Sequence, residues 1–256
     1  MQFSNSRQTP SSRMPSSQQS AISQGWKAVG RALISGFVDA YTLMNFGVYA
    51  SFMSGNTTSG GLHVGQANVA AATHSLLPIP FFILGIFLGT LLMHGDCRPG
   101  LARLSVLVSA LLSLDIVAAL FAWPAWLSVV ILSSAMGILN TSITHVGGQS
   151  VGLGFVTGDL NSLSQHVALE IKHAPVLHKQ GSWDTHWLRA ALLAGIWVAF
   201  FLGAVLGAVL APRLGDWTLL LPAILLIIFA LLDRRAISFA SGNIGLRHID
   251  LEQHRN

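Results

Sequence analysis

Charged residues are scarce in this sequence of 256 amino acids, in which Asp, Glu, Lys and Arg together make up 9%. A typical soluble domain carries about 25% charged residues, because water must solvate its surface. Hydrophobic residues reach 52% here, and the mean hydropathy is +0.60. The sequence therefore predicts an integral membrane protein and excludes a disordered chain and a nucleic-acid-binding domain.

Cysteine is nearly absent as well, since Cys97 stands alone in the sequence. An internal disulfide and a CxxC-type redox or zinc site each need at least two cysteines, so both are excluded. The sequence also lacks the GxSxG, P-loop, HExxH and Rossmann motifs that accompany common catalytic and cofactor sites. We expect no metal, no cofactor and no enzymatic activity, and a membrane-embedded enzyme is the weakest of the alternatives below.

Long apolar runs dominate what is present. Six of them approach the roughly 20 residues that cross a bilayer, at 32–50, 76–93, 104–121, 127–146, 190–211 and 217–232. Two further stretches, 52–73 and 155–169, carry almost no full charge but many Gly, Ser, Thr, Asn and Gln residues. Such polar side chains are unfavourable against lipid, so these two segments are expected to be re-entrant or buried.

Charge placement discriminates between two topologies. With six spans and two re-entrant or short polar helices, only Arg213 among the 14 Lys and Arg residues lies outside. With eight spans, Arg98 and Arg103 lie outside too. The positive-inside rule favours six spans in an all-α polytopic protein, with eight as the alternative. Both topologies leave both termini in the cytosol, with a disordered tail over 1–26, one transmembrane domain over 27–233 and a second tail over 234–256.

The membrane domain contains an internal repeat. GFVDA at 36–40 is matched by GILNT at 137–141, and FMSGN at 52–56 by FVTGD at 155–159. An LGxxLG pattern at 84–89 recurs at 202–207. These blocks predict one repeat over 27–121 and another over 125–233. Three spans in each half would invert the second half, as in many transporters, whereas four would make the repeats parallel.

The same motifs carry a resemblance to a known family. GFVDAYTL, FMSGNT, GILNTS and FVTGDL resemble the YoaK-like family of bacterial integral membrane proteins, which is a domain of unknown function. The resemblance covers nearly the whole chain apart from the tails, and Ser54 stands where that family often has Thr. It implies a multi-span protein of the bacterial inner membrane and implies no activity.

Polar residues inside the predicted membrane domain are the candidates for a substrate or ion site, because burying them in lipid is costly. They are Asp39, Ser54, Asn56, His63, Asn140, Thr157, Asp159 and His166, with Asp115 as a secondary candidate. Ser54 and Thr157 are expected to cap the two polar helices. The remaining primary candidates are expected to converge on one central cluster at the repeat interface. Two GxxxG pairs should mediate close helix packing, with the two helices meeting each other; they are formed by Gly85, Gly89, Gly203 and Gly207.

Three function classes follow from these features. The repeat, the polar helices and the intramembrane carboxylates favour a transporter or channel for a small polar solute or ion. A structural or signalling membrane protein is the first alternative, in which the acidic residues fix helix packing. A membrane-embedded enzyme is the second. The expected partners are the lipid bilayer and a small solute, without nucleic acid, and the sequence leaves homo-oligomerisation open.

Overall fold

The computed structural model describes residues 16–93, 97–142, 145–146, 148–152 and 156–234, which are almost entirely helical. Its α-helices are α1 (Ser16–Phe46), α2 (Met53–Gly65), α3 (Val69–Leu76), α4 (Pro78–Met93), α5 (Cys97–Leu120), α6 (Ala125–Asn140), α7 (Val156–Ile171) and α8 (His186–Leu214). A 3₁₀ helix, η1 (Gly215–Leu219), follows α8, and residues 220–234 are again helical. The strands β1 (His145–Val146) and β2 (Gln149–Ser150) pair antiparallel.

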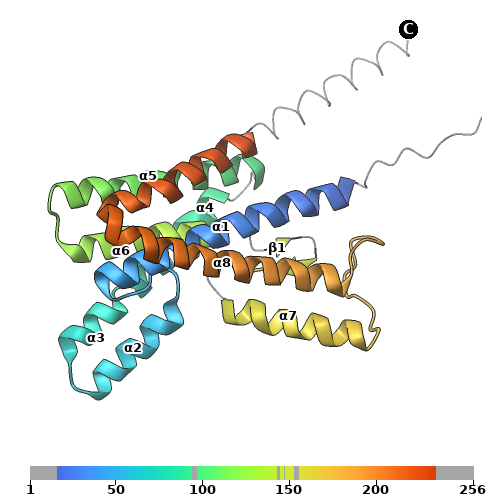
Figure 1. The fold of residues 1–256 in the computed structure, drawn as a ribbon, viewed down its shortest axis with the longest axis horizontal. Helices are drawn as coiled ribbons and strands as arrows, with labels where there is room; N and C mark the ends of the chain where they lie inside the picture. Colours follow the sequence, from blue (N-terminus) through green and yellow to red (C-terminus); the bar gives the residue numbers. More distant parts are fainter. Residues whose placement is uncertain (1–15, 94–96, 143–144, 147, 153–155, 235–256) are drawn as a thin grey trace, which may run out of the picture.

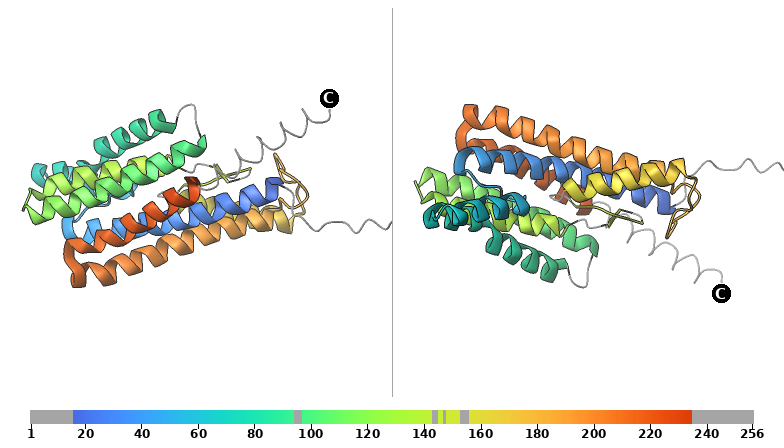
Figure 2. Two further views of the ribbon diagram at one scale, coloured as in Figure 1. Left: turned by 90° about the horizontal axis from the view of Figure 1, so that it is seen from above. Right: turned by 90° about the horizontal axis from the view of Figure 1, so that it is seen from below.

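The long helices lie along the long axis of the molecule (Figure 1). α1, α5 and α8 run away from the end at which α1 begins, and α4, α6 and the helix over 220–234 run back toward it (Figure 2). The reversal after α8 occurs at Gly215, whose φ of +55° lies in the left-handed region that glycine adopts without strain. The hairpin of α2 and α3 lies at the far end, and α7 lies toward the end at which α1 begins (Figure 1).

Within the described residues, three helical segments are long and apolar enough to cross a membrane, namely Val69–Met93, Gly100–Leu120 and His186–Arg234. The last has 49 residues and includes the reversal at Gly215. The 16 residues of α6 are also apolar, whereas α1 carries Lys27, Arg31 and Asp39 among its 31 residues. These helices agree with a polytopic α-helical membrane protein.

The prediction of a disordered tail over 1–26 is wrong for residues 16–26, because α1 already begins at Ser16. This first portion of α1 packs beside the loop before α8, where the indole Nε1 of Trp183 donates a hydrogen bond to Ser17 Oγ over 3.4 Å. No glycine or proline interrupts residues 16–24, so the helix continues beyond the membrane domain. Residues 1–15 and 235–256 of the predicted tails lie outside the described part of the chain.

Glycines allow α1 to pack directly on α8. A Cβ added to Gly203 would lie 2.8 Å from the carbonyl carbon of Leu33 and 3.0 Å from its Cα. A Cβ on Gly36 would lie equally close to the backbone of Phe200, at 2.8 Å from its carbonyl carbon. Only glycine permits such backbone approach, which allows the two helices to form extensive dispersion contacts.

The helices α4 and α6 pack in the same way. A Cβ on Gly85 would lie 3.0 Å from Gly137 Cα, and a Cβ on Gly89 would lie 3.2 Å from Ile138 Cα. The packing role predicted for the GxxxG glycines is therefore supported, but the predicted contact between their two helices is wrong. Each GxxxG helix instead packs on a helix that carries a glycine of its own, because two small surfaces approach more closely than one.

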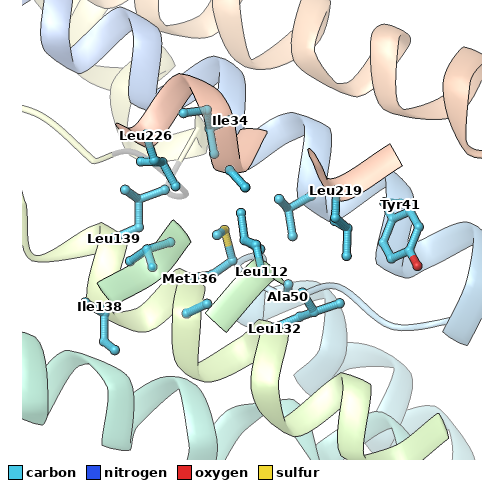
Figure 3. Close-up of a cluster of buried hydrophobic side chains, with 14 of the residues drawn as sticks. Ile34, Tyr41, Ala50, Leu112, Leu132, Met136, Ile138, Leu139, Leu219 and Leu226 are labelled. Carbon is cyan, nitrogen blue, oxygen red and sulfur yellow. The ribbon is translucent and has the colours of Figure 1, made fainter. Parts of the chain in front are cut away.

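The main hydrophobic core lies between α1, α5, α6 and the helix over 220–234 (Figure 3). Ile34, Leu112, Leu132, Met136 and Leu226 are all buried in it. Figure 3 also shows Tyr41 at the margin of these side chains, with its hydroxyl oxygen pointing away from them. The core therefore joins elements from the first and second parts of the chain.

Candidate functional site

The loop before α2 is held by Asn56, one of the predicted site residues. Asn56 is 1% exposed; its Oδ1 accepts a hydrogen bond from Tyr49 N at 3.0 Å, and its Nδ2 donates to Tyr49 O at 2.7 Å. Ser54 does not cap the helix, so that prediction is wrong. α2 begins at Met53, so that Ser54 lies within its first turn and its side chain is exposed.

The loop before α7 is held by Asp159 in a closely similar way. Asp159 is 4% exposed, and its Oδ1 accepts a hydrogen bond from Gly152 N at 3.2 Å. The carboxylate lies in the first turn of α7, where it complements the positive end of the helix dipole. Thr157 is the second residue of α7 and is exposed, so the predicted capping role is wrong for Thr157 as well.

Asp39 anchors the start of the α1–α2 loop. It is 3% exposed; Oδ1 accepts from Ser51 N and Oδ2 from Ser51 Oγ, both at 2.6 Å. Ser51 Oγ also lies 3.0 Å from Ser35 Oγ on the previous turn of α1. These charge-assisted hydrogen bonds are short and strong, and they fix the loop to the middle of α1. Asn140, the predicted counterpart of Asp39, is the half-buried last residue of α6.

No hydrogen bond joins any two of the six candidates among the described residues, and the prediction of one cluster that holds both histidines is wrong. Asp39, Asn56 and Asp159 each bond a loop in their own part of the chain. His63 is on α2 and His166 on α7, and these two helices lie toward opposite ends of the molecule (Figure 1). The physical reason is that each polar group is satisfied by the backbone of its neighbouring loop, which removes the need for a shared centre.

His166 instead belongs to a hydrogen-bonded chain with Gln149 and His186. Gln149 Nε2 donates to Ser150 O at 2.8 Å, which leaves Oε1 to accept from His166 Nε2 at 2.5 Å. His166 Nδ1 must then accept the proton of His186 Nδ1, 2.8 Å away. His186 Nε2 is buried and has no hydrogen-bond partner among the described residues.

An ion pair lies beside this chain, outside the apolar segments. Arg189 donates to Asp184 from Nε at 2.9 Å and from Nη2 at 2.8 Å. These hydrogen bonds lower the pKa of Asp184 below its ordinary value, because they stabilise the carboxylate. Burial lowers the pKa of His166, and the neighbouring His186 and Arg189 add to the effect. The surroundings of His166 therefore disfavour its charged form.

A pocket of about 280 Å³ opens next to the ion pair, between the first part of α1 and the first part of α8. Its walls are mostly apolar, with Trp26 and Val29 from α1 and Leu192 from α8. Gln149 and Arg189 supply polar groups at its edge. The pocket thus lies between helices, at one end of the membrane domain.

A second polar group lies near the far ends of α1 and α5. Asp115 is 1% exposed, and the hydroxyl of Ser128 on α6 lies beside its carboxylate. Its Oδ1 has no hydrogen-bond partner among the described residues. Tyr41 on α1 donates to Asp216 Oδ1 of η1 at 2.7 Å, and the charges of Asp115 and Asp216 lie close enough to interact. Four elements from both parts of the chain therefore meet here.

A third group neutralises Asp233, which is 4% exposed near the end of the last helix. Lys27 Nζ lies 2.5 Å from Asp233 Oδ1, and Arg31 Nη2 lies 3.3 Å from Asp233 Oδ2. The fully buried Arg31 also donates to Ser105 Oγ at 3.2 Å, and its guanidinium lies 5.7 Å from the ring centre of Phe229. Two cations therefore share one buried carboxylate, which ties α1 to the last helix.

The described residues contain no group of three or more His, Cys, Asp or Glu side chains placed together as metal ligands.

Known proteins match the same part of the chain that holds these helices, loops and buried polar groups. The family model described as "Protein of unknown function (DUF1275)" matches residues 28–232. The chain belongs to this DUF1275 family. A UPF0700 transmembrane protein of Rhizobium meliloti (strain 1021) is 32% identical over 203 residues, which cover 77% of this chain and 83% of the relative. No solved structure matches the chain. The predicted resemblance to a membrane protein family of unknown function is thereby confirmed.

Several polar residues of this DUF1275 protein were missed from the sequence, namely Lys27, Arg31, Tyr41, Ser128, Gln149, His186, Asp216 and Asp233. Most lie at or beyond the limits of the predicted spans, where polar residues are ordinary and carry no signal. A signal for Asp233 does exist, because LLSLD at 111–115 resembles FALLD at 229–233. Extending the repeat comparison to the last helix would have paired Asp115 with Asp233.

Proposed function

We propose that this DUF1275 protein is a transporter or channel for a small polar solute or ion, built from two inverted repeats. Each repeat would contribute three spans and one re-entrant helix. The first comprises α1, α2, α4 and α5, and the second comprises α6, α7, α8 and the helix over 220–234. This arrangement assigns six spans, with the two tails on the cytosolic side of the bacterial inner membrane.

The observation that carries the proposal is the recurrence of individual contacts in both halves. An offset of 101 residues relates Gly36 to Gly137, and an offset of 118 relates Gly85 to Gly203. At these offsets, the contact of Gly203 with Leu33 corresponds to that of Gly85 with Ser134. The packing of Gly36 on Phe200 likewise corresponds to that of Gly137 on Phe82. Each half thus places its GxxxG helix on the first helix of the other half.

The loops before the short polar helices recur as well. Asn56 accepts from Tyr49 N, and Asp159 accepts from Gly152 N. Both acceptors lie seven residues beyond their donors, and an offset of 103 relates both residue pairs. Equivalent local hydrogen bonds in two distant segments support a duplicated design rather than a chance similarity of sequence.

Helix direction and length support the inverted, re-entrant form of that design. α1 runs away from the end of the molecule at which it begins, whereas α6, its counterpart, runs toward that end (Figure 2). The 13 residues of α2 and the 16 of α7 span about 20 Å and 24 Å at 1.5 Å per residue. α2 falls well short of the roughly 30 Å of hydrocarbon. α7 is no longer than α6 and differs from it in its many polar residues. Helices that begin at membrane depth in inverted repeats are typical of transporter substrate sites.

A purely structural role is the second candidate function, and a specific observation favours it. Asp39, Asn56 and Asp159 are all bonded to the backbone of neighbouring loops, as packing residues would be. The two candidates differ in one property, because only a transporter or channel carries solute across a sealed bilayer.

Reconstitution into liposomes tests the proposal. Efflux and influx would be followed for sodium, potassium, methylammonium and glycerol by stopped-flow light scattering, and for protons by an entrapped pH dye. We expect at least one of these solutes to cross faster than in protein-free liposomes. We also expect Asn56→Ala to change that flux at least tenfold, because it releases the loop before α2.

Thr58→Ala is the matched control, since the exposed Thr58 hydroxyl bonds only to Ser54 O within the same helix. Its flux should stay within twofold of the wild-type value. Equal permeability of wild-type and protein-free liposomes for every solute would refute transport and favour the structural role.

A further inference from the structure

Two buried carboxylates occupy equivalent positions but have different surroundings. The offset of 118 that relates Gly85 to Gly203 also relates Asp115 to Asp233. The offset of 101 that relates Gly36 to Gly137 also relates Lys27 to Ser128 and Arg31 to Leu132. The neighbours follow the same correspondence, because Asp233 pairs with Lys27 and the hydroxyl of Ser128 lies beside Asp115.

The cations that neutralise one carboxylate are therefore replaced at the other. Where Asp233 meets an ammonium and a guanidinium group, Asp115 meets a hydroxyl, and the fully buried Leu132 stands in the place of Arg31. No Lys, Arg or His of the described residues forms an ion pair with Asp115. Its Oδ1 is buried and has no partner within the described part of the chain. The site thus has the acceptor of an ion pair without the cation.

Other oxygen ligands surround this carboxylate. The Tyr41 hydroxyl points away from the aliphatic core and donates to Asp216 Oδ1 (Figure 3). Asp216 is exposed and lies near enough to interact with the charge of Asp115. α5 packs against both α6 and η1, and α1 packs against α6, so Asp115 and Ser128 lie near the Tyr41–Asp216 pair where these four elements meet. Asp216 connects this buried group to the surface.

An isolated buried carboxylate is costly unless an opposite charge compensates for it. A second carboxylate nearby increases that cost, because like charges repel. The same fold resolves the problem at Asp233 with an ammonium group of its own. A mobile cation of comparable size can compensate Asp115 in the same manner.

We propose that Asp115, Ser128, Tyr41 and Asp216 form a binding site for a small monovalent cation, which occupies the place that Lys27 Nζ takes beside Asp233. The inference rests on the proposed function, because it names the substrate or coupling ion of that transporter or channel. Its geometry comes from the correspondence between the two repeats. The ligand chemistry is that of one positive charge bound by oxygen atoms. Its source is either an alkali metal ion or the ammonium group of a small amine.

Thermal stability of the purified protein in detergent tests the site without any transport. The chloride salt of the bulky cation N-methyl-D-glucamine would be replaced stepwise by sodium, potassium or methylammonium chloride, at constant ionic strength. A ligand that binds only the folded state raises the melting temperature in a saturable way. We expect at least one of the three cations to do so, and the responding cation identifies the source.

Three variants assign the effect to this site. Asp115→Asn should weaken the apparent affinity for that cation at least tenfold. Ser128→Lys supplies the ammonium group found in the other half, so it should raise the melting temperature without added cation and abolish the response. Ser134→Ala is the control, because its hydroxyl bonds only to Val130 O along α6; its response should match the wild type within twofold.

The inference is overturned if none of the three cations stabilises the wild type, or if Asp115→Asn responds with unchanged affinity. A melting temperature that depends on pH alone would show that a proton compensates the charge of Asp115. That result also overturns the inference. If Asp115→Asn does not fold, Ser128→Lys decides, and a cation response retained in that variant rejects the site. Solute flux without cation binding would reject the site and keep the proposed function. Cation binding without solute flux would keep the site and reject the proposed function.

Discussion

Replacing Gly203 by alanine should loosen the contact between α1 and α8. The new Cβ would lie 2.8 Å from the carbonyl carbon of Leu33 and 3.0 Å from its Cα. The carbonyl oxygen of Leu33 would lie closer still. Carbon atoms prefer separations of about 3.5–4.0 Å, so the helices must separate by roughly 1 Å or more. Overpacking of this kind costs about 3 kcal/mol, of which the higher helix propensity of alanine restores about 1 kcal/mol. A net loss near 2 kcal/mol corresponds to a drop of roughly 4–8 °C in melting temperature for a domain of this size.

Gly61→Ala is the matched control for this experiment. Gly61 lies within α2, and a Cβ added there would have no neighbouring atom within 4 Å. The same chemical change should therefore leave the stability unchanged or raise it by up to about 1 kcal/mol. Apparent melting temperatures of both variants in detergent provide the comparison. If Gly203→Ala melts with the wild type and Gly61→Ala, the close packing of α8 on α1 is incorrect.

Further predictions concern charge and pH. Asp233→Asn should destabilise the protein by about 3–5 kcal/mol, because it leaves the fully buried Arg31 without its counter-charge; wild-type stability of this variant would show that the ion pair contributes nothing. The surroundings of His166 lower its pKa and so favour the neutral form in the folded state. Stability from this residue should therefore be lost as the pH falls below the ordinary histidine pKa of about 6.5. The melting temperature of His166→Asn should decline less than that of the wild type between about pH 7 and pH 5, and equal slopes would contradict the assignment.

The membrane class and the helices were predictable because they depend on long apolar runs, which a sequence displays directly. The polar helices α2 and α7 were predictable too, since Gly, Ser and Asn cluster in both stretches. The packing partners of the GxxxG glycines were not predictable from the sequence. Gly85 can pack against any small surface, and the structure shows that it packs against α6. Sequence spacing alone could not show that Gly203 contacts α1.

The predicted central cluster failed for a related reason. Intramembrane position marks Asp39 and Asp159 as costly to bury, but it does not say which groups satisfy them. Backbone N–H groups of nearby loops do so here, at Ser51 and Gly152. The group around Asp115 escaped detection because its partners come from four separate elements. Asp216 in particular follows the apolar run of α8 and resembles an ordinary loop residue.

The inverted arrangement of the two halves is tested most directly by cysteine accessibility in intact cells. A membrane-impermeant maleimide would be applied to the wild type, which has Cys97 alone, and to Ala67→Cys and Ala122→Cys, each made with Cys97→Ser. Six spans with two re-entrant helices expose positions 67 and 122 outside and leave Cys97 unlabelled until the cells are opened. Labelling of Cys97 in intact cells, with positions 67 and 122 protected, would instead show eight spans and parallel repeats, and would contradict the proposed architecture.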